Sequence, residues 1–406
     1  MIDGPYKLPK GWRWVRLGEV ASRPQYGYTK SATLHPIGPK FVRITDITSG
    51  EIDWSKVPYC ECDTKKLEKY RLYPGDVLFA RSGSVGATIL IKETPYDAVF
   101  ASYLIRVRFR ESVLSEFANL LLKAPVCQRQ LIPQGAAQKN INARLIESIL
   151  VPLPPMSEQQ RIVAKVEMLM EQVREARRLR QKAVEDADRL WQSVLADTFP
   201  HPGTDLPSNW RWVRLVEIFE FQQGVSMSSK RRQGKNPKPF LRTRNIFWGK
   251  ADISSIDEMD FTDEEIEKFR LQSGDLLVCE GGDVGKTAIW EEQLPLVLYQ
   301  NHIHRLRPVN ALIESRFFMY WMQTAYKVFQ EYQGLESRTA IPNLSSSRLK
   351  QFVAPLPPLD VQRHVVAHLK ATQEKIKTLK DSQAQFETEL QRLEQSILDS
   401  AFKGEL

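Results

Sequence analysis

The sequence predicts an α+β protein made of two mixed α/β domains, each followed by one long α-helix. Two observations lead to this fold class. The segment 153–199 is repeated without a gap at 356–402; both copies begin within Pro-Leu-Pro-Pro, and afterwards neither contains Pro or Gly. Shorter segments upstream are repeated in the same order, so the chain is a duplicated unit of roughly half its 406 residues.

The upstream repeats suggest the domain boundaries. LPKGWRWVRL at 8–17 matches LPSNWRWVRL at 206–215, and LYPGDVLFARSGSVGAT at 72–88 matches LQSGDLLVCEGGDVGKT at 271–287. The globular halves diverge more than the helices, which indicates a shared scaffold with different recognition surfaces. The expected divisions are a first domain over 1–152, a helix over 153–200, a second domain over 201–355 and a second helix over 356–406.

Each globular half has the pattern of short strands mixed with helices. Apolar runs bounded by turn residues, such as those flanking the Gly-rich turn 82–86, predict strands. Aromatic residues of the longer helical runs, Phe317 and Trp321 among them, are expected to be core residues. The expected strands are 75–80, 88–91, 99–108, 150–153, 297–307 and 352–356; the expected helices are 113–124 and 312–332, and polar loops lie at 135–142 and 334–343.

The start of each long helix carries a capping signal. Ser157 is a good N-cap residue, and Gln160 three positions later completes a capping box. Asp360 is the expected cap of the second copy, although Arg363 does not complete the box there. The prolines just before each cap end the preceding segment.

Apolar residues along both long segments recur in alternating steps of four and three, which is the period of a coiled coil. At about 1.5 Å per residue, each helix would be roughly 60 Å long. The period predicts that the two helices pack on each other and leaves open whether they run parallel or antiparallel. Arg180 and Gln383 hold the same rank in the two copies, where a polar residue fixes register. The predicted seam is Ile162, Val166, Leu169, Val173, Ala176, Arg180, Ala183, Ala187, Leu190 and Val194 with Val365, Leu369, Thr372, Ile376, Leu379, Gln383, Phe386, Leu390, Leu393 and Ile397.

Composition places the chain among globular proteins and suggests a polyanionic partner. The formal net charge is +8, and charged residues make up an ordinary 26% of the chain. Four cysteines without paired spacing predict reduced, structural thiols rather than a zinc site or a disulfide framework. The sequence has neither an apolar signal core nor a run long enough to span a membrane, so we expect a cytoplasmic protein.

No motif predicts catalysis. GGDVGKT at 281–287 resembles a phosphate-binding loop, but Glu280 stands where the first glycine is required, and the sister copy has no lysine. The pairs His302/His304 and His364/His368 lack a third metal ligand, so solvated or partner-facing histidines are expected. Neither a nucleophile motif nor a cofactor loop is present.

Recognition remains as the predicted role of the polar loops. Arg and Lys match guanine edges, Gln and Asn match adenine, and carboxylates match cytosine amines, whereas lysine clusters suit phosphates. Which loop residues contact bases and which contact phosphates is left open. The candidates are Tyr26, Tyr28, Lys30, Arg43, Arg81, Ser82, Ser84, Gln134, Gln138, Lys139 and Asn140 in the first half, and Lys230, Arg231, Arg232, Lys235, Arg242, Arg244, Asn245, Glu280, Asp283, Lys286, Asn301, His302 and Arg338 in the second.

These repeats, in this order, resemble the specificity subunit of a type I DNA restriction-modification system over nearly the whole chain. The marks are the two WRWVRL segments, the two Gly-Asp segments and PLPPMSEQQRIV with PLPPLDVQRHVV. The resemblance implies that each globular half is a target recognition domain for one part of a bipartite double-stranded DNA site. It also implies that the helices pack antiparallel, set the spacer between the half-sites and dock two methyltransferase subunits.

The resemblance further implies that the chain is not an enzyme and binds no cofactor. S-adenosylmethionine would belong to the adenine methyltransferase subunits, and ATP and Mg would belong to a restriction subunit, in a bacterial or archaeal cytoplasm. Three alternatives stay open: a coiled-coil protein-interaction adaptor without DNA specificity, an enzyme using GGDVGKT as a nucleotide site, and a specificity subunit of a methylation-only system.

Overall fold

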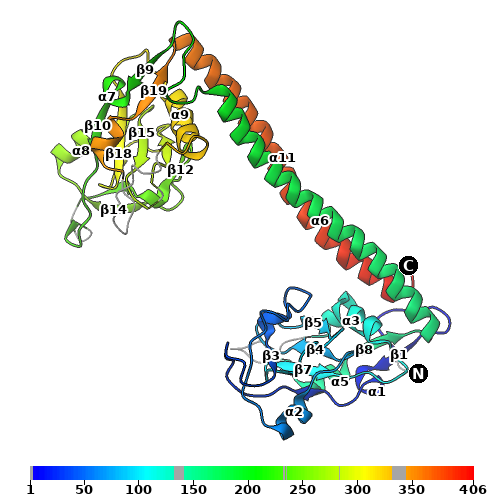
Figure 1. The fold of residues 1–406 in the computed structure, drawn as a ribbon. Helices are drawn as coiled ribbons and strands as arrows, with labels where there is room; N and C mark the ends of the chain where they lie inside the picture. Colours follow the sequence, from blue (N-terminus) through cyan, green and yellow to red (C-terminus); the bar gives the residue numbers. More distant parts are fainter. Residues whose placement is uncertain (1–2, 132–140, 232–233, 235, 283, 332–343) are drawn as a thin grey trace. The chain divides into compact units, whose positions relative to one another are not determined.

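The computed structural model describes residues 3–131, 141–231, 234, 236–282, 284–331 and 344–406. The chain forms two compact units, which are described separately. Unit 1 consists of Met1–Arg180 with Ala384–Leu406, and unit 2 consists of Gln181–Gln383. Each unit therefore contains one globular domain and parts of both long helices, α6 (Met156–Thr198) and α11 (Leu359–Lys403) (Figure 1). The domain boundaries expected from the repeats stay a prediction.

The domain of unit 1 is built on a four-stranded antiparallel sheet in the order β2-β7-β4-β5. The short strands β3 and β6 pair in parallel, and β1 pairs with β8. The strands are β1 Arg13–Arg16, β2 Gln25–Tyr26, β3 Lys40–Val42, β4 Val77–Ala80, β5 Thr88–Leu90, β6 Ala98–Phe100, β7 Leu104–Val107 and β8 Leu150–Leu153; the helices are α1 Leu17–Val20, the 3-10 helix η1 Ile44–Asp46, α2 Thr64–Tyr70, α3 Ser115–Lys123, α4 Pro125–Gln128 and α5 Ala143–Ser148.

The domain of unit 2 repeats this plan with the antiparallel sheet β10-β18-β15-β16 and the pair β9-β19. It adds a three-stranded sheet, β14-β11-β17, and a small hairpin, β12-β13. The strands are β9 Arg211–Arg214, β10 Phe219–Gln223, β11 Pro237–Leu241, β12 Ile246–Phe247, β13 Lys250–Ala251, β14 Asp257–Asp260, β15 Leu276–Cys279, β16 Thr287–Ile289, β17 Leu298–Tyr299, β18 Ile303–Pro308 and β19 Val353–Leu356; the helices are α7 Leu215–Ile218, the 3-10 helix η3 Thr243–Asn245, α8 Asp263–Phe269, α9 Ser315–Lys327 and α10 Ser346–Lys350.

Two predicted strands are each two strands in the structure. The run 99–108 is divided into β6 and β7 by a turn at residues 101–103, and the run 297–307 is divided into β17 and β18. The residue pattern hid the turns, because these strands bury polar residues such as Arg106, His304 and Arg305, so polarity does not mark where a strand ends. The turn places Tyr103 and His302 directly before the second strand in each pair.

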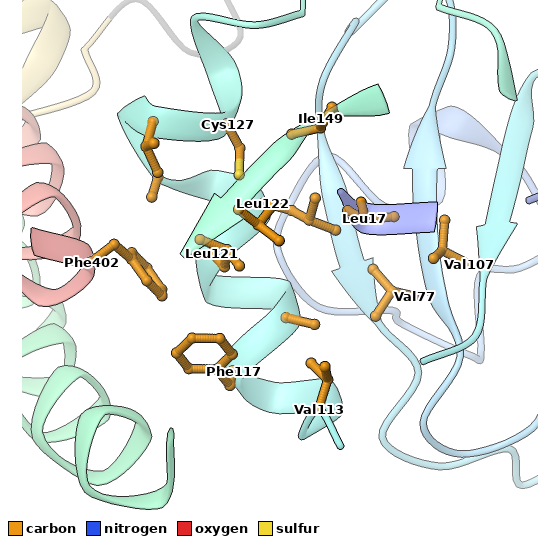
Figure 2. Packing of buried hydrophobic residues seen from close by; sticks show 14 of the residues in the cluster. Leu17, Val77, Val107, Val113, Phe117, Leu121, Leu122, Cys127, Ile149 and Phe402 are labelled. Atoms are coloured by element: carbon orange, nitrogen blue, oxygen red, sulfur yellow. The ribbon is translucent and has the colours of Figure 1, made fainter. Parts of the chain in front are cut away.

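In each domain, one helix packs on the main sheet and also contacts a residue of the long-helix segments. In unit 1, Phe117 and Leu121 of α3 face Phe402 of α11, with the Phe117 and Phe402 ring centroids 5.3 Å apart (Figure 2). In unit 2, the buried Phe317 and Trp321 of α9 pack against Phe199 at the end of α6. The prediction that these α9 aromatic residues are core residues is confirmed.

The long helices begin earlier than the capping signals predicted. α6 begins at Met156, with the carbonyl of Pro155 accepting from the backbone N–H groups of Glu158 and Gln159, so Ser157 lies inside the first turn. Asp360 likewise lies inside the first turn of α11. The Pro155 carbonyl, rather than a side chain, thus accepts from backbone N–H groups of the first turn of α6. Negative charge in the first turn still stabilises α11 through the helix dipole.

Contacts between the two helices occur within each unit. In unit 1, Ile162, Val166 and Val173 of α6 share one core cluster with Ile397 and Leu398 of α11. The guanidinium of Arg177 donates to the carboxylates of Glu387 and Glu394, at 3.0 and 2.7 Å. In unit 2, Leu195 of α6 shares a cluster with Val366 and Leu369 of α11.

The contact surface differs from the predicted seam at four positions. Leu190, Leu379, Phe386 and Leu393 are 53, 41, 50 and 48% exposed. Glu387 and Glu394, which follow Phe386 and Leu393, form ion pairs with Arg177 of α6. Trp191, which follows Leu190, packs on Tyr320 of α9 in the globular domain. The physical reason is that a straight α-helix drifts by about 20° per heptad from a strict four–three step.

Three further features concern the cysteines, the apolarity of the helices and the grouping of possible metal ligands. All four cysteines are free, and three of them are buried. None of the helices in the described ranges is long and apolar enough to cross a membrane. Within those same ranges, no three His, Cys, Asp or Glu side chains converge to hold a metal ion.

Candidate nucleic-acid interface

The main sheet of each domain presents three side chains at one end. In unit 1, Tyr26 ends β2, Arg81 follows β4 and Tyr103 precedes β7. The register brings these positions together, because Ala80 pairs with Leu104 and Tyr26 pairs with Ile105. We call Tyr26, Arg81 and Tyr103 the first sheet-end triad.

Unit 2 presents the equivalent set. Gln223 ends β10, Glu280 follows β15 and His302 precedes β18. The register is the same, because Cys279 pairs with Ile303 and Gln223 pairs with His304. We call Gln223, Glu280 and His302 the second sheet-end triad.

A glycine fixes the path of the chain behind each triad. Gly27 follows Tyr26 and Gly224 follows Gln223. A Cβ at Gly27 would lie 2.2 Å from the carbonyl oxygen of Ala101, and one at Gly224 would lie 2.3 Å from that of Gln300. Only glycine allows the backbone to pass this close to the preceding turn. The close approach therefore holds the first member of each triad against the turn that carries the third.

In the first triad, a cation lies on an aromatic ring. The guanidinium carbon of Arg81 lies 4.9 Å from the centroid of the Tyr26 ring. The Tyr26 hydroxyl accepts from the backbone N–H of Ala143 at 3.0 Å, which fixes the ring. The backbone N–H of Arg81 donates to the carbonyl of Tyr103, whose side chain is 62% exposed. This surface combines hydrogen-bond donors with exposed aromatic faces.

In the second triad, a carboxylate takes the place of the cation. The amide of Gln223 donates to Oε2 of Glu280 at 2.8 Å and to the carbonyl of Asn301 at 2.9 Å. The backbone N–H of Glu280 donates to the carbonyl of His302, which is exposed. Behind them, Nε2 of the buried His304 donates to the carbonyl of Leu344 at 3.2 Å and lies 3.8 Å from Oε2 of Glu280.

Burial favours the neutral form of the His304 ring inside this domain. Burial lowers the pKa of its ring below the ordinary value, while the Glu280 carboxylate opposes the effect. The equivalent residue in unit 1 is Ile105, so the first domain has no such titrating group behind its triad.

The other predicted residues of unit 1 lie apart from the first triad or are held by local partners. The Tyr28 ring stacks on Tyr70 with centroids 5.4 Å apart. Lys30 pairs with Glu61, which raises the pKa of the Lys30 ammonium. Arg43 makes a two-pronged contact with Asp46. Ser82 and Ser84 lie in the turn between β4 and β5 beside Arg81.

Three predicted cations and one amide of unit 2 support the fold. Both prongs of Arg231 bind the carboxylate of Glu265, at 2.8 and 2.7 Å. Arg242 and Arg244 share the carboxylate of Asp257. The amide of Asn245 is buried and donates to two backbone carbonyls, those of Asp252 and Ser255. Asn245 thus closes a turn and has no amide hydrogen left for a base.

The rest of the predicted set of unit 2 divides between the triad and its surroundings. Asn301 lies next to His302 and accepts from Gln223 through its carbonyl. The ammonium of Lys286 lies 5.4 Å from the centroid of the exposed Phe247 ring, and Lys230 is exposed. Eight predicted residues lie outside the described part of the chain: Gln134, Gln138, Lys139, Asn140, Arg232, Lys235, Asp283 and Arg338.

The GGDVGKT segment is a hairpin turn. It connects β15 to the antiparallel β16, and Gly282 and Gly285 adopt the left-handed backbone conformation with φ of +76° and +78°. A phosphate-binding loop requires a helix after the strand. The expectation that this segment is not such a loop agrees with the hairpin geometry.

Sequence reasoning identified Tyr26, Arg81, Glu280 and His302 but missed Tyr103 and Gln223. A signal for both was present in the repeats. Tyr103 aligns with His302, and Gln223 precedes Gly224 as Tyr26 precedes Gly27. The triads combine donors, acceptors and aromatic rings that can contact the edges and faces of bases.

Two domains of one fold that present different polar groups at the same sheet end define a duplicated recognition protein. The chain matches the family described as type I restriction modification DNA specificity domain twice, over residues 9–182 and 207–388. These matches include most of the chain, and the protein therefore belongs to this family of type I restriction-modification specificity proteins.

Similarity to related proteins covers between about half and nearly all of this chain. The type I restriction enzyme EcoKI specificity subunit of Escherichia coli K12 is 29% identical over 200 residues, which is 47% of this chain and 41% of that relative. The StySPI specificity subunit of Salmonella potsdam is 22% identical over 98% of this chain and 90% of its own length. The chain thus spans less than half of the first relative and most of the second.

Solved structures show the same mixed α+β fold with two repeated domains. The HsdS subunit from Thermoanaerobacter tengcongensis is 32% identical with a TM-score of 0.62, and the match covers 100% of both chains. A chain from a study of complex assembly and conformational transition of the type I R-M system is 31% identical, with a TM-score of 0.75, over 99% of this chain and 100% of that one.

Proposed function

We propose that this chain is the DNA sequence-recognition subunit of a type I restriction-modification complex and that each domain recognises one half of a bipartite site. The observation that carries the proposal is the pair of sheet-end triads, which share their framework and differ in chemistry. A single domain type with different residues at one place is what two different half-sites require. Family membership supports the same conclusion.

The two long helices would form an antiparallel coiled coil that holds the domains apart. Support comes from contacts inside each unit. In unit 1 the start of α6 shares a cluster with the end of α11, and in unit 2 the end of α6 shares a cluster with the start of α11. Lys380 also pairs with Asp188 in unit 2, as the opposite direction of the two helices requires.

The helices would also dock two methyltransferase subunits. Met168 and Leu179 of α6 and Leu379 and Phe386 of α11 are 49, 52, 41 and 50% exposed, so both helices carry apolar side chains that a protein partner could cover. S-adenosylmethionine would be bound by the methyltransferase subunits, and ATP with Mg by a restriction subunit. This chain would supply specificity to both activities without catalysing either.

The proposal is tested by mapping adenine methylation in cells that express this chain with its neighbouring methyltransferase subunit. The comparison strain expresses the methyltransferase alone. We expect a split motif, modified on both strands, only when this chain is present. Co-purification of the two proteins without a new motif would contradict the DNA-recognition role.

A second measurement separates this function from that of a protein-interaction adaptor. Binding of the purified complex to duplex DNA should weaken steeply as salt rises, because phosphate contacts release counterions. An adaptor without DNA specificity would not bind the duplex at any salt concentration.

A further inference from the structure

The two triads differ in the sign of the charge at one equivalent position. Arg81 follows β4 and Glu280 follows β15, and the strands on either side have the same register in both domains. The backbone around the two residues is also equivalent. The carbonyl of Arg81 accepts from the N–H of Ile141, and the carbonyl of Glu280 accepts from the N–H of Leu344.

A carboxylate at this position excludes a role in contacting phosphate. A phosphate would repel Glu280, and the Glu280 side chain is only 12% exposed, so screening by solvent is weak. If the two domains approach DNA with the same sheet end, the position occupied by Glu280 faces bases, and so does the position occupied by Arg81. Arg81 is then a base contact rather than a phosphate contact.

The chemistry of each group selects a base edge. The guanidinium of Arg81 contains only donors. Its Nε is buried, so the terminal nitrogens are the donors that a base could meet. Donor pairs match the O6 and N7 acceptors of guanine. The carboxylate of Glu280 contains only acceptors, and it matches the amine of cytosine or of adenine.

Both groups are held in place before any ligand binds. The fixed ring of Tyr26 supports the Arg81 guanidinium, and Gln223 holds one carboxylate oxygen of Glu280. Tyr103 and His302 occupy the third position of each triad and are exposed.

We propose that the sheet-end triads contact bases and that the two domains select opposite hydrogen-bonding groups on them. Arg81 donates to a guanine in the first half-site, and Glu280 accepts from an amine-bearing base in the second. The inference rests on the proposed function and deepens it. Tyr103 and His302 are further specificity-determining residues, one for each half-site.

The test uses the complex of this chain with its methyltransferase subunit and maps adenine methylation genome-wide. We expect Arg81→Ala to reduce the preference for G·C over other base pairs at one position of the first half-site by about 10- to 100-fold. The base preferences of the second half-site should stay unchanged. Glu280→Ala should relax one position of the second half-site only. Glu280→Gln separates the two amines: an adenine preference is retained by glutamine, whereas a cytosine preference changes toward adenine.

Matched controls come from the same domains. Arg110 lies beyond the opposite end of β7, and Glu258 lies on β14; both are exposed. Arg110→Ala and Glu258→Ala should leave both half-sites unchanged. Tyr103→Ala and His302→Ala remove exposed side chains and keep the domains folded, so they test the triads if a variant at Arg81 or Glu280 does not fold.

Three outcomes are distinguishable. No split motif with the wild-type chain would refute the proposed function itself. A split motif that stays unchanged, or that is weakened evenly at all positions, in Arg81→Ala, Glu280→Ala, Tyr103→Ala and His302→Ala would leave that function standing and overturn the base-reading role. Relaxation at an A·T position by Arg81→Ala would overturn the guanine assignment.

Discussion

The aspartate of each repeated Gly-Asp sequence is buried and ion-paired. Asp76 accepts from the guanidinium of Arg108 and from the backbone N–H of Tyr73, and Asp275 does the same with Arg307 and Gln272. The two carboxylates are 2% and 1% exposed. Each aspartate therefore joins the turn before one strand to the neighbouring strand of the main sheet.

We expect Asp76→Asn to lower the free energy of unfolding of unit 1 by about 3 kcal/mol, because the variant removes the carboxylate beside the buried Arg106 as well as the partner of Arg108. Urea denaturation would measure the change. Glu61→Gln is the matched control: Glu61 pairs with Lys30 on the surface, and its loss should cost less than about 1 kcal/mol. Equal effects of the two variants would argue against a stabilising role for the buried pair.

A second prediction at this scale concerns the pH dependence of unit 2. The pKa of His304 is lowered by burial in the folded domain, whereas the unfolded chain has the ordinary value of about 6.5. Below that pH the unfolded state binds a proton that the folded state does not. The free energy of unfolding should then fall with decreasing pH, by at most about 1.4 kcal/mol per pH unit.

Denaturation of unit 2 between pH 7 and pH 5 would measure this slope. His304→Ile, which copies Ile105 of the other domain, should reduce it. His302→Ala, which removes an exposed histidine of the same domain, is the control variant. The same slope in wild type and His304→Ile would show that other groups cause the pH dependence.

At the scale of elements, one glutamine fastens each long helix to its domain. The amide of Gln159 donates to the carbonyls of Pro154 and Ser112 and accepts from the N–H of Leu114, just before α3. Gln362 makes the same three bonds with Pro357, Leu312 and Glu314. Both side chains are 1% exposed, so the start of each helix is joined to its domain by a buried, satisfied polar group.

Gln159→Leu should lower the free energy of unfolding of unit 1 by about 3 kcal/mol, since it leaves several buried backbone groups without partners. Hydrogen exchange in the first turns of α6 should accelerate as well. Gln160→Leu is the matched control, because the neighbouring Gln160 is exposed. If both variants behave alike, the three hydrogen bonds of Gln159 do not stabilise the junction.

The sequence predicted the long elements better than their junctions. The two long helices followed from the absence of Pro and Gly and from the apolar spacing, and the strand at 150–153 agrees with β8. The role of Gln159 was missed, because its partners Ser112 and Leu114 are distant in sequence. Apolar spacing does not include the drift of a straight helix. Of the predicted seam residues of α11, Phe386 and Leu393 are exposed, whereas Leu390 packs against the core of unit 1.

The candidate site was predicted in part. Arg81 and Glu280 were identifiable because they flank a repeated Gly-rich turn. Arg231 and Asn245 looked equally suitable, yet Glu265 and the backbone of the turn bind them in the fold. Only the folded domain shows which polar residues lie at the sheet end and which are bound elsewhere in the fold.

At the scale of the whole molecule, the proposed antiparallel helix pair would determine the distance between half-sites. Removing one heptad from both helices, residues 174–180 of α6 with 387–393 of α11, would shorten the pair by about 10 Å. We expect the spacer of the methylated motif to shorten by at most about three base pairs while both half-sites persist. Methylation mapping would measure the spacer.

Removing the heptad from α6 alone is the control. The remaining helix would then face its partner out of register, and the subunit should fail to assemble. A spacer that stays the same after the matched deletion would refute the idea that helix length sets it. A change in the half-sites themselves would show that the helices take part in base recognition.

The division of the chain into units means that the domain synthesised first is completed last. Unit 1 is completed by residues 384–406, whereas unit 2 uses one uninterrupted stretch, 181–383. The first domain therefore leaves the ribosome early but lacks Phe402 against Phe117 until translation reaches the end of α11. A premature stop codon in that last segment would expose the core of the domain made first and spare the core of the domain made second.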